Sequence, residues 1–194
     1  MFGKLYLILV LIFSTLSLAN TNNYAFEKMH ENTWIQVGTW QVKKLDDHGV
    51  LELTEVSSSQ YFNLCFTKDI HFLDGMLSVK FKANSGYVDQ GGGLMWRVQD
   101  KDNYYVARFN PLEDNFRFYI VRDGMRKELA SADMKLDAGW HGMKIVQKGS
   151  HFEGFIDDIK LLDYDDTQLQ KSGGVGMWTK ADALTSFSGL NITK

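Results

Sequence analysis

Arginine, tyrosine and asparagine side chains recur on one predicted face of a β-rich stretch that runs from Val88 to Arg126. Guanidinium groups bind pairs of hydroxyl groups, and aromatic rings pack on the C–H faces of sugar rings. These residue types therefore favour a site for a polyhydroxylated ligand. The set consists of Arg97, Tyr104, Arg108, Asn110, Arg117 and Tyr119. The alternative is that they form only the solvated face of an antiparallel sheet, where Arg and Tyr are common.

Three short strands position this set, and we predict them at residues 93–98, 104–109 and 116–122. In each of them β-branched and aromatic residues alternate with polar ones, and turn-forming residues separate the strands. Because successive side chains of a strand point to opposite faces, the second face of this sheet is predicted to be apolar. It carries Leu94, Trp96, Val98, Tyr105, Ala107, Phe109, Phe116, Phe118 and Ile120.

Trp178 is a further candidate for ligand binding. It follows the glycine-rich run 173–176, and by strand alternation it points away from Met177 and Thr179. It could serve as a platform on which a sugar stacks beside the arginines, or it could close the core. Large aromatic residues of sandwich proteins are usually buried, which favours the core.

Length and composition favour one β-domain. The 194 residues suffice for a single domain with a large core, and the net charge of -3 without a basic tract argues against nucleic-acid binding. We count about twelve short strand patterns with turn signals between them, and no sustained helical period or fixed repeat. Such a chain closes its sheets on each other, so we predict an all-β, antiparallel two-sheet sandwich of jelly-roll type.

Residues 1–19 have the pattern of a cleavable signal peptide. Lys4 precedes an apolar run at 5–13, and Ser17 and Ala19 provide a small-x-small cleavage site. The run is short for a membrane span, and an uncleaved anchor is the alternative. We therefore expect a single sandwich domain at 20–194 that is secreted or periplasmic and has no stable membrane span after cleavage.

Three segments resemble a known group of proteins: the run from Val88 to Arg126, the later GWHGMKIV and the terminal GGVGMWTKADALTSF. They resemble exported domains with the concanavalin A-like lectin/glucanase sandwich, and most of all the group related to the 3-keto-disaccharide hydrolase domain. The resemblance extends over about residues 34–192 and implies one concave sheet able to hold a saccharide. It does not settle an activity, because function depends on the site.

The resemblance also bears on metal binding. Related sandwiches commonly end in an aromatic-Asp-Asp-aromatic strand whose acidic groups help to bind a structural calcium ion, whereas this chain has SFSGL at 186–190. Calcium needs several hard oxygen ligands, preferably carboxylates. We therefore predict no metal site, and we expect no cofactor.

Motifs for catalysis are sparse. Retaining glucanases of this general fold carry two glutamates in a Glu-x-Asp-x-x-Glu spacing, which the chain lacks. The acidic pairs at 113–114, 157–158 and 165–166 fall at predicted turns, where a solvated role is favoured. The five histidines have no metal-binding spacing, and the single cysteine, Cys65, is predicted to be a small buried residue. If the protein is a hydrolase, the candidates for its acid are Asp89, Asp102 and Glu113.

The favoured function is an exported carbohydrate-binding domain that recognises a saccharide on its concave sheet without catalysis. The alternatives are a hydrolase or lyase acting on 3-keto-disaccharides or related glycosides, and a protein-interaction domain. If the arginines bind ligand, we expect Arg108→Ala to abolish binding and to leave stability nearly unchanged.

Overall fold

The computed structural model describes residues 21–24, 26, 34–45, 48–56 and 62–194. These residues form strands, turns and loops and contain no α-helix. No helix in these ranges is long and apolar enough to cross a lipid bilayer. The predicted signal peptide lies outside the described residues.

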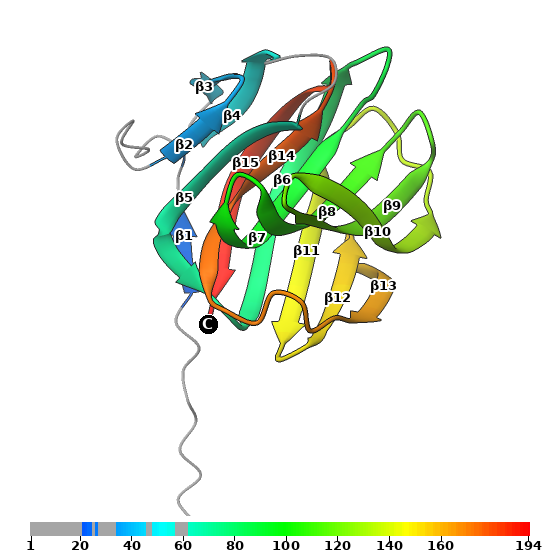
Figure 1. Ribbon diagram of the computed structural model, residues 1–194. Coiled ribbons are helices and arrows are strands. Elements are labelled where there is room, and N and C mark those ends of the chain that lie inside the picture. Colours follow the sequence, from blue (N-terminus) through cyan, green and yellow to red (C-terminus); the bar gives the residue numbers. More distant parts are fainter. Residues whose placement is uncertain (1–20, 25, 27–33, 46–47, 57–61) are drawn as a thin grey trace, which may run out of the picture.

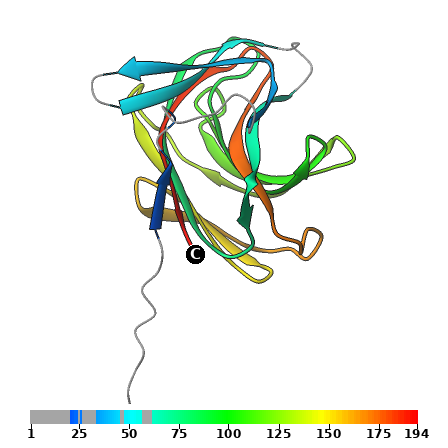
Figure 2. The ribbon, with the colours of Figure 1, turned by 90° about the vertical axis from the view of Figure 1, so that its left-hand side faces the viewer.

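The strands form two antiparallel sheets stacked on each other (Figures 1 and 2). One sheet has the order β13-β12-β11-β6-β15-β4-β3, with β1 also paired to β15. Its strands are β1 (Thr21–Tyr24), β3 (Thr39–Leu45), β4 (His48–Glu55), β6 (Gly75–Ser85), β11 (His141–Lys148), β12 (His151–Ile156), β13 (Ile159–Asp165) and β15 (Leu184–Thr193).

The other sheet has the order β10-β9-β8-β7-β14-β5-β2. Its strands are β2 (Trp34–Val37), β5 (Phe62–Phe72), β7 (Gly92–Asp100), β8 (Asn103–Asn110), β9 (Asn115–Arg122), β10 (Met125–Asp133) and β14 (Gly173–Lys180). We call the two sheets the eight-stranded and the seven-stranded sheet. This arrangement confirms the predicted all-β, antiparallel two-sheet sandwich.

Aromatic side chains fill the space between the sheets. Trp96 of β7 lies with its ring centroid 5.9 Å from that of Phe118 and 5.6 Å from that of Phe152, which comes from the opposite sheet. A buried indole N–H needs an acceptor. Trp96 finds it across the sandwich, because its Nε1 donates to Oε1 of Gln147 on β11 at 2.8 Å. This bond ties the two sheets together inside the core.

The predicted strands around Val88–Arg126 are confirmed as β7, β8 and β9. Between residues 61 and 74 the sequence pattern predicts two short pieces, at 61–66 and 70–74; this is wrong, because one long strand, β5, occupies most of the segment. Its polar residues 67–69 suggested a break. They lie where the pairing of β5 with β14 shifts register, so the ladder continues past them through an irregularity.

A β-bulge at Arg97 changes the expected faces of β7. The pairing of β7 with β8 shifts register after Trp96, and Arg97 has a left-handed φ of 48°. The extra residue of a bulge reverses the alternation beyond it. Val98, expected in the core, therefore joins the apolar cluster on the outer face, with Met95 and Val106. The other residues predicted for the apolar face lie in the core between the sheets.

Gly154 of β12 leaves room for the aromatic core. A Cβ at this position would lie 2.5 Å from Cζ of Phe118 and 2.8 Å from Cε1 of Phe116. Real Cβ atoms do not approach carbon so closely, so any side chain here would push the rings out of place. The glycine therefore sets how near β12 can lie to the opposite sheet.

We expect Gly154→Ala to lower the free energy of unfolding by about 1–3 kcal/mol, because it overpacks the core. Gly142→Ala is the matched control on the neighbouring strand β11, since its Cβ would meet only Oδ1 of Asp157, at 3.7 Å. Urea unfolding of both variants tests the prediction, and equal losses at the two positions would contradict it.

Candidate ligand-binding site

A cluster of charged and polar side chains lies on the outer face of the seven-stranded sheet and centres on Arg108 of β8. This side chain is 1% exposed. Its Nη2 donates to Oδ1 of Asp89 at 2.8 Å, and its Nη1 lies 3.3 Å from Oη of Tyr119 and 3.5 Å from Oε2 of Glu113. We call the group the Arg108 cluster. Its members are Asp89, Arg108, Asn110, Glu113, Arg117, Tyr119, Arg126 and Lys180.

Asp89 reaches the cluster from the loop before β7. The Asp182 carboxylate holds this loop by accepting the backbone N–H groups of Tyr87, Val88 and Asp89, at 2.6, 3.0 and 2.9 Å. Burial opposes the charge on Asp182, but these three hydrogen bonds outweigh it and lower the pKa of the carboxyl group. The loop thereby presents a buried Asp89 at a fixed position.

Asp89 is shared by several donors. Besides Arg108, it accepts a hydrogen bond from Nδ2 of Asn110 at 3.0 Å, and Nζ of Lys180 lies 3.3 Å from its Oδ2. Arg108 and Asn110 belong to β8 and Lys180 ends β14, so three side chains from two strands converge on one carboxylate. Lys180 was not among the residues predicted for the site, although it follows Trp178 and Thr179 in the sequence.

Glu113 lies in the turn between β8 and β9, and it bridges two arginines. Arg108 and Arg117 are directly opposite each other on β8 and β9, and like charges so placed repel. Oε2 of Glu113 accepts from Nη1 of Arg117 at 3.0 Å and from Nδ2 of Asn115 at 3.0 Å. The turn was predicted correctly and the Glu113 side chain is solvated as expected, but the carboxylate is also an ion-pair partner of two arginines, which was not predicted.

The protonation of Glu113 follows from these contacts. Partial burial favours the neutral carboxyl group, but Asn115, Arg108 and Arg117 outweigh burial and lower the pKa of Glu113 below its usual value. Glu113 is therefore a carboxylate at neutral pH, with the remaining lone pairs of a half-exposed group free to accept hydrogen bonds.

Tyr104 and Trp178 lie underneath the Arg108 cluster. Both are fully buried, and Nε1 of Trp178 donates to Oη of Tyr104 at 3.1 Å. Their rings belong to the apolar cluster on this outer face, together with Leu64 and Met95. In this structure the two side chains support the charged cluster from below. The platform considered for Trp178 is therefore covered by other side chains.

Arg126 of β10 lies over three aromatic rings of this outer face, and it was not among the residues predicted for the site. Its Cζ is 4.3 Å from the ring centroid of Tyr119, 5.7 Å from that of Trp178 and 5.8 Å from that of Phe62. A guanidinium over aromatic faces is a favourable cation–π arrangement. Alternation on the fourth strand of the meander was the available signal, but the sequence pattern predicts only a short strand there, at 128–130, which does not include Arg126.

Arg97, which was predicted for the site, lies elsewhere. The bulge turns its side chain toward the end of the sandwich, where it donates to the carbonyl oxygens of Leu73, Gly149 and Leu169 at 3.0, 2.7 and 2.9 Å. It also pairs with Asp74 at 3.3 Å. Arg97 therefore holds three loops together and has no contact with Arg108. Of the three candidate acids, Asp89 and Glu113 meet at Arg108, whereas Asp102 pairs with Lys101 in the turn between β7 and β8.

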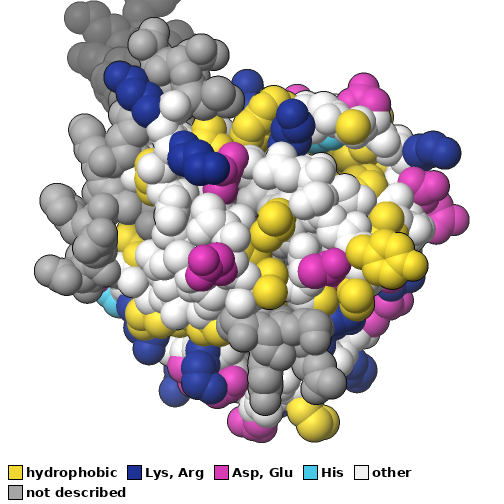
Figure 3. Space-filling view, turned by 90° about the horizontal axis from the view of Figure 1, so that it is seen from above, with side chains coloured by type: hydrophobic (Ala, Val, Ile, Leu, Met, Phe, Trp, Pro, Cys, Tyr) yellow, Lys and Arg dark blue, Asp and Glu magenta, His cyan; other side chains and the backbone are white. Residues whose placement is uncertain are grey.

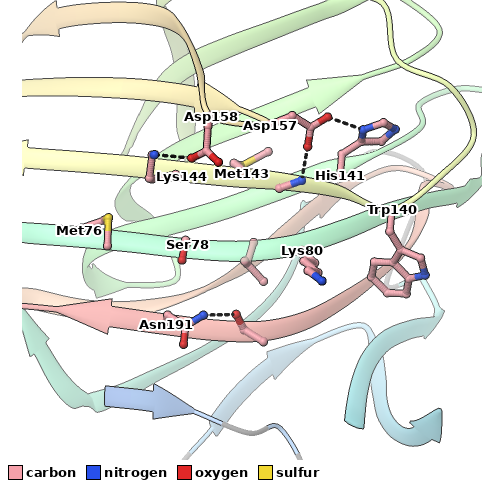
Figure 4. A pocket seen from close by; sticks show the side chains of 13 residues that line it. Met76, Ser78, Lys80, Trp140, His141, Met143, Lys144, Asp157, Asp158 and Asn191 are labelled. Atoms are coloured by element: carbon pink, nitrogen blue, oxygen red, sulfur yellow. Dashed lines mark hydrogen bonds and ion pairs between the residues drawn. The ribbon is translucent and has the colours of Figure 1, made fainter. Parts of the chain in front are cut away.

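A hollow of about 620 Å³ lies on the outer face of the eight-stranded sheet (Figure 4). Trp140 lies at one end of it, near Lys80, and the side chains of Ser78 and Asn191 line its middle. The acidic residues 157–158, expected to be solvated, engage neighbours along its edge. Asp157 binds His141 and the Gly142 backbone N–H, and Asp158 binds Lys144. This hollow contains none of the predicted site residues.

One group of side chains has the geometry for a metal ion. His151, Glu153 and Asp163 on the β12–β13 hairpin have ligand atoms within 4.8 Å of one another. Nζ of Lys160 lies 2.9 Å from both carboxylates, so a cation of the protein already occupies the position between them. Such an arrangement is an exposed ion-pair network, and the predicted absence of a metal stays a prediction.

The surface seen from above mixes both signs of charge (Figure 3). Basic and acidic side chains are scattered among polar ones over the described part of this face, and hydrophobic atoms occur in small groups. Cys65 is fully buried, and burial raises the pKa of its thiol, which confirms its predicted role as a buried apolar residue.

Comparisons with solved structures identify the fold. The chain is similar to the carbohydrate-binding module CBM66 from Bacillus subtilis, with a TM-score of 0.69, 20% identity, and coverage of 82% of this chain and 95% of the other. It is also similar to a β-glucanase of Bacillus licheniformis (TM-score 0.62, 12% identity, coverage 90% and 98%). A third match is a prokaryotic β-1,3-1,4-glucanase derived from a mouse hindgut metagenome (TM-score 0.61, 14% identity, coverage 90% and 98%).

These similarities confirm a concanavalin A-like jelly-roll sandwich. No known protein family and no curated protein matches the sequence. The fold is therefore established from structure, while the resemblance to the 3-keto-disaccharide hydrolase group stays a prediction.

Arg97 gives a first test of which arginines are structural. Arg97→Ala should lower the free energy of unfolding by about 3 kcal/mol, because it leaves carbonyl groups at three loops without their charged donor. Arg117→Ala, which removes a part-exposed arginine of the same sandwich, should cost no more than about 1 kcal/mol. Urea unfolding measures the loss of unfolding free energy in both variants. A larger loss for Arg117→Ala than for Arg97→Ala would show that Arg117, and not Arg97, is the structural arginine.

The charge on His141, at the edge of the hollow, should make the stability of the protein depend on pH. Burial disfavours the charged imidazole, but hydrogen bonds with Asp157 and Asp137 outweigh it and raise the pKa of His141. The stabilisation is therefore fully present below the ordinary histidine pKa and is lost as the pH rises through the folded-state pKa. The unfolding free energy of the native protein minus that of His141→Gln should be about 0.5–1 kcal/mol at acidic pH and shrink in alkali. A difference that grows with pH would refute this.

Proposed function

We propose that the protein is a carbohydrate-binding domain and that the Arg108 cluster is its saccharide site. The observation that carries this proposal is the convergence of Asp89, Glu113 and Tyr119 on a buried Arg108 at the outer face of the seven-stranded sheet. Charged donors and acceptors held side by side match the paired hydroxyl groups of a sugar ring.

The rigidity of the cluster supports binding. Each charged group at its centre is fixed by a partner: Arg108 by Asp89, Arg117 by Glu113, and Asp89 also by Lys180. A site whose side chains are already ordered loses little conformational entropy when a ligand arrives. Glu113 and Arg117 are part-exposed, so their remaining hydrogen-bonding capacity faces solvent. The same fold in a carbohydrate-binding module and in glucanases agrees with this proposal.

The protonation states favour binding without catalysis. A glycoside hydrolase needs a protonated carboxyl group to donate to the leaving oxygen, with a pKa raised toward neutrality. The pKa of Glu113 is lowered instead, so this group is a poor general acid. Asp89 forms ion pairs with both Arg108 and Lys180, so its carboxylate oxygens are already engaged within the cluster.

Binding should be tested by titrating the purified protein with a panel of neutral and acidic oligosaccharides in a calorimeter, with a parallel assay for released reducing sugar. We expect at least one saccharide to bind without release of product. Glu113→Gln should weaken that binding at least about tenfold, because a charged hydrogen-bonding group contributes about 1.5–3 kcal/mol.

Trp140→Ala is the control, because it removes an exposed aromatic ring from the hollow on the eight-stranded sheet. It should leave the affinity unchanged. Loss of binding in Trp140→Ala, with Glu113→Gln unaffected, would move the ligand to the opposite sheet. Release of sugar would replace the proposal with a hydrolase, and no binding by any saccharide would refute it.

A further inference from the structure

We propose that the saccharide bound by the Arg108 cluster carries a carboxylate, and that Arg126 binds this carboxylate. The inference rests on the proposed function, because it assigns a charge to the ligand of the same site. It is based on the ion pairing and on the hydrogen-bond donors of the cluster.

Arg126 is a partly buried cation without a counter-ion among the described residues. Its guanidinium lies against the rings of Tyr119, Trp178 and Phe62, and no carboxylate within the described ranges forms an ion pair with it. Asp89 and Glu113 attract it only from a distance. Arginine does not lose its proton in proteins, so the charge stays in place. A partly buried cation without a carboxylate partner carries a desolvation cost, which contacts with aromatic rings offset only in part.

The charges of the cluster confirm that Arg126 is the unmatched group. Arg108 pairs with Asp89 and Glu113, Lys180 pairs with Asp89, and Arg117 pairs with Glu113 and with Glu128 of β10. Together with Arg126, and with Glu128 counted as a neighbour of the cluster, these are four cations and three carboxylates. One positive charge is left, so a ligand with one negative charge at this position would neutralise the site.

Two hydrogen-bond donors without a partner also favour an anionic ligand. Nη1 of Arg126 and Nε of Arg108 are both buried, and neither has a hydrogen-bond partner in the described part of the chain. Buried N–H groups of this kind are normally satisfied, and each unsatisfied one costs free energy. A neutral hydroxyl group could accept one hydrogen bond here, but only an anion also offsets the charge. A carboxylate is the planar acceptor that a guanidinium binds best, and uronic acid residues supply it within a sugar.

The test compares each acidic oligosaccharide with its own neutral form. Oligomers of galacturonate, glucuronate and mannuronate are titrated beside the same oligomers after reduction of their carboxyl groups to alcohols. We expect at least one acidic oligomer to bind at least tenfold more tightly than its reduced form. In Arg126→Gln, which keeps a planar amide without the charge, this preference should disappear.

Arg122→Gln is the matched control, because Arg122 is an exposed arginine on the same β9–β10 hairpin and its loss changes the net charge equally. It should keep the preference for the acidic form. Without ligand, Arg126→Gln should melt at the same temperature as the native protein or higher, because it removes an unmatched charge. A lower melting temperature with unchanged binding would show that Arg126 is structural.

The outcomes separate this inference from the proposed function. Equal affinity for the acidic and reduced forms would overturn the carboxylate assignment and leave the saccharide site intact. Binding of a sulfated oligosaccharide alone would also overturn it. Failure of every saccharide, neutral or acidic, would refute the proposed function itself.

Discussion

The buried ion pair between Arg108 and Asp89 is the interaction on which the outer face of the seven-stranded sheet depends. Its two side chains are almost inaccessible, and a buried charge is tolerated only when it is paired and hydrogen-bonded. The loop before β7, the end of β8 and the end of β14 must all be in place to satisfy Asp89. The buried pair therefore argues against the expectation that Arg108 could be removed with little effect on stability, since its loss would leave the buried Asp89 with only Asn110 and Lys180 as partners.

The two-sheet architecture explains why a polar site can be built on a sheet that is largely apolar on both faces. The core between the sheets already supplies a continuous aromatic and aliphatic interior. A second apolar cluster, which includes Tyr104 and Trp178, lies on the outer face beneath the charged groups. It separates these groups from the main core and excludes water from one side of them. Electrostatic interactions are stronger in such surroundings than in bulk water. The apolar base and the charged layer thus act together.

Alternation of residue types was sufficient to predict the sandwich, the apolar face of the meander and four members of the Arg108 cluster. It failed at Arg97, because a bulge is a backbone conformation that no local side-chain pattern reveals. Asp89 and Glu113 were named only as possible acids. They are loop residues 24 positions apart in the sequence, and they come together in the site only after folding. Arg126 was missed because an exposed edge strand has a weak apolar pattern, although its pairing with β9 places it over Tyr119.

The hydrogen bonds from the loop of Tyr87–Asp89 to Asp182 have a consequence for how this surface can diversify. Three backbone N–H groups hold the loop, so its path depends little on which side chains it carries at Tyr87 and Val88, and both of these are largely exposed. Substitutions at these two positions would alter the rim of the site without displacing the buried carboxylate. One anchored loop can therefore accept changes in selectivity while the charged centre keeps its geometry.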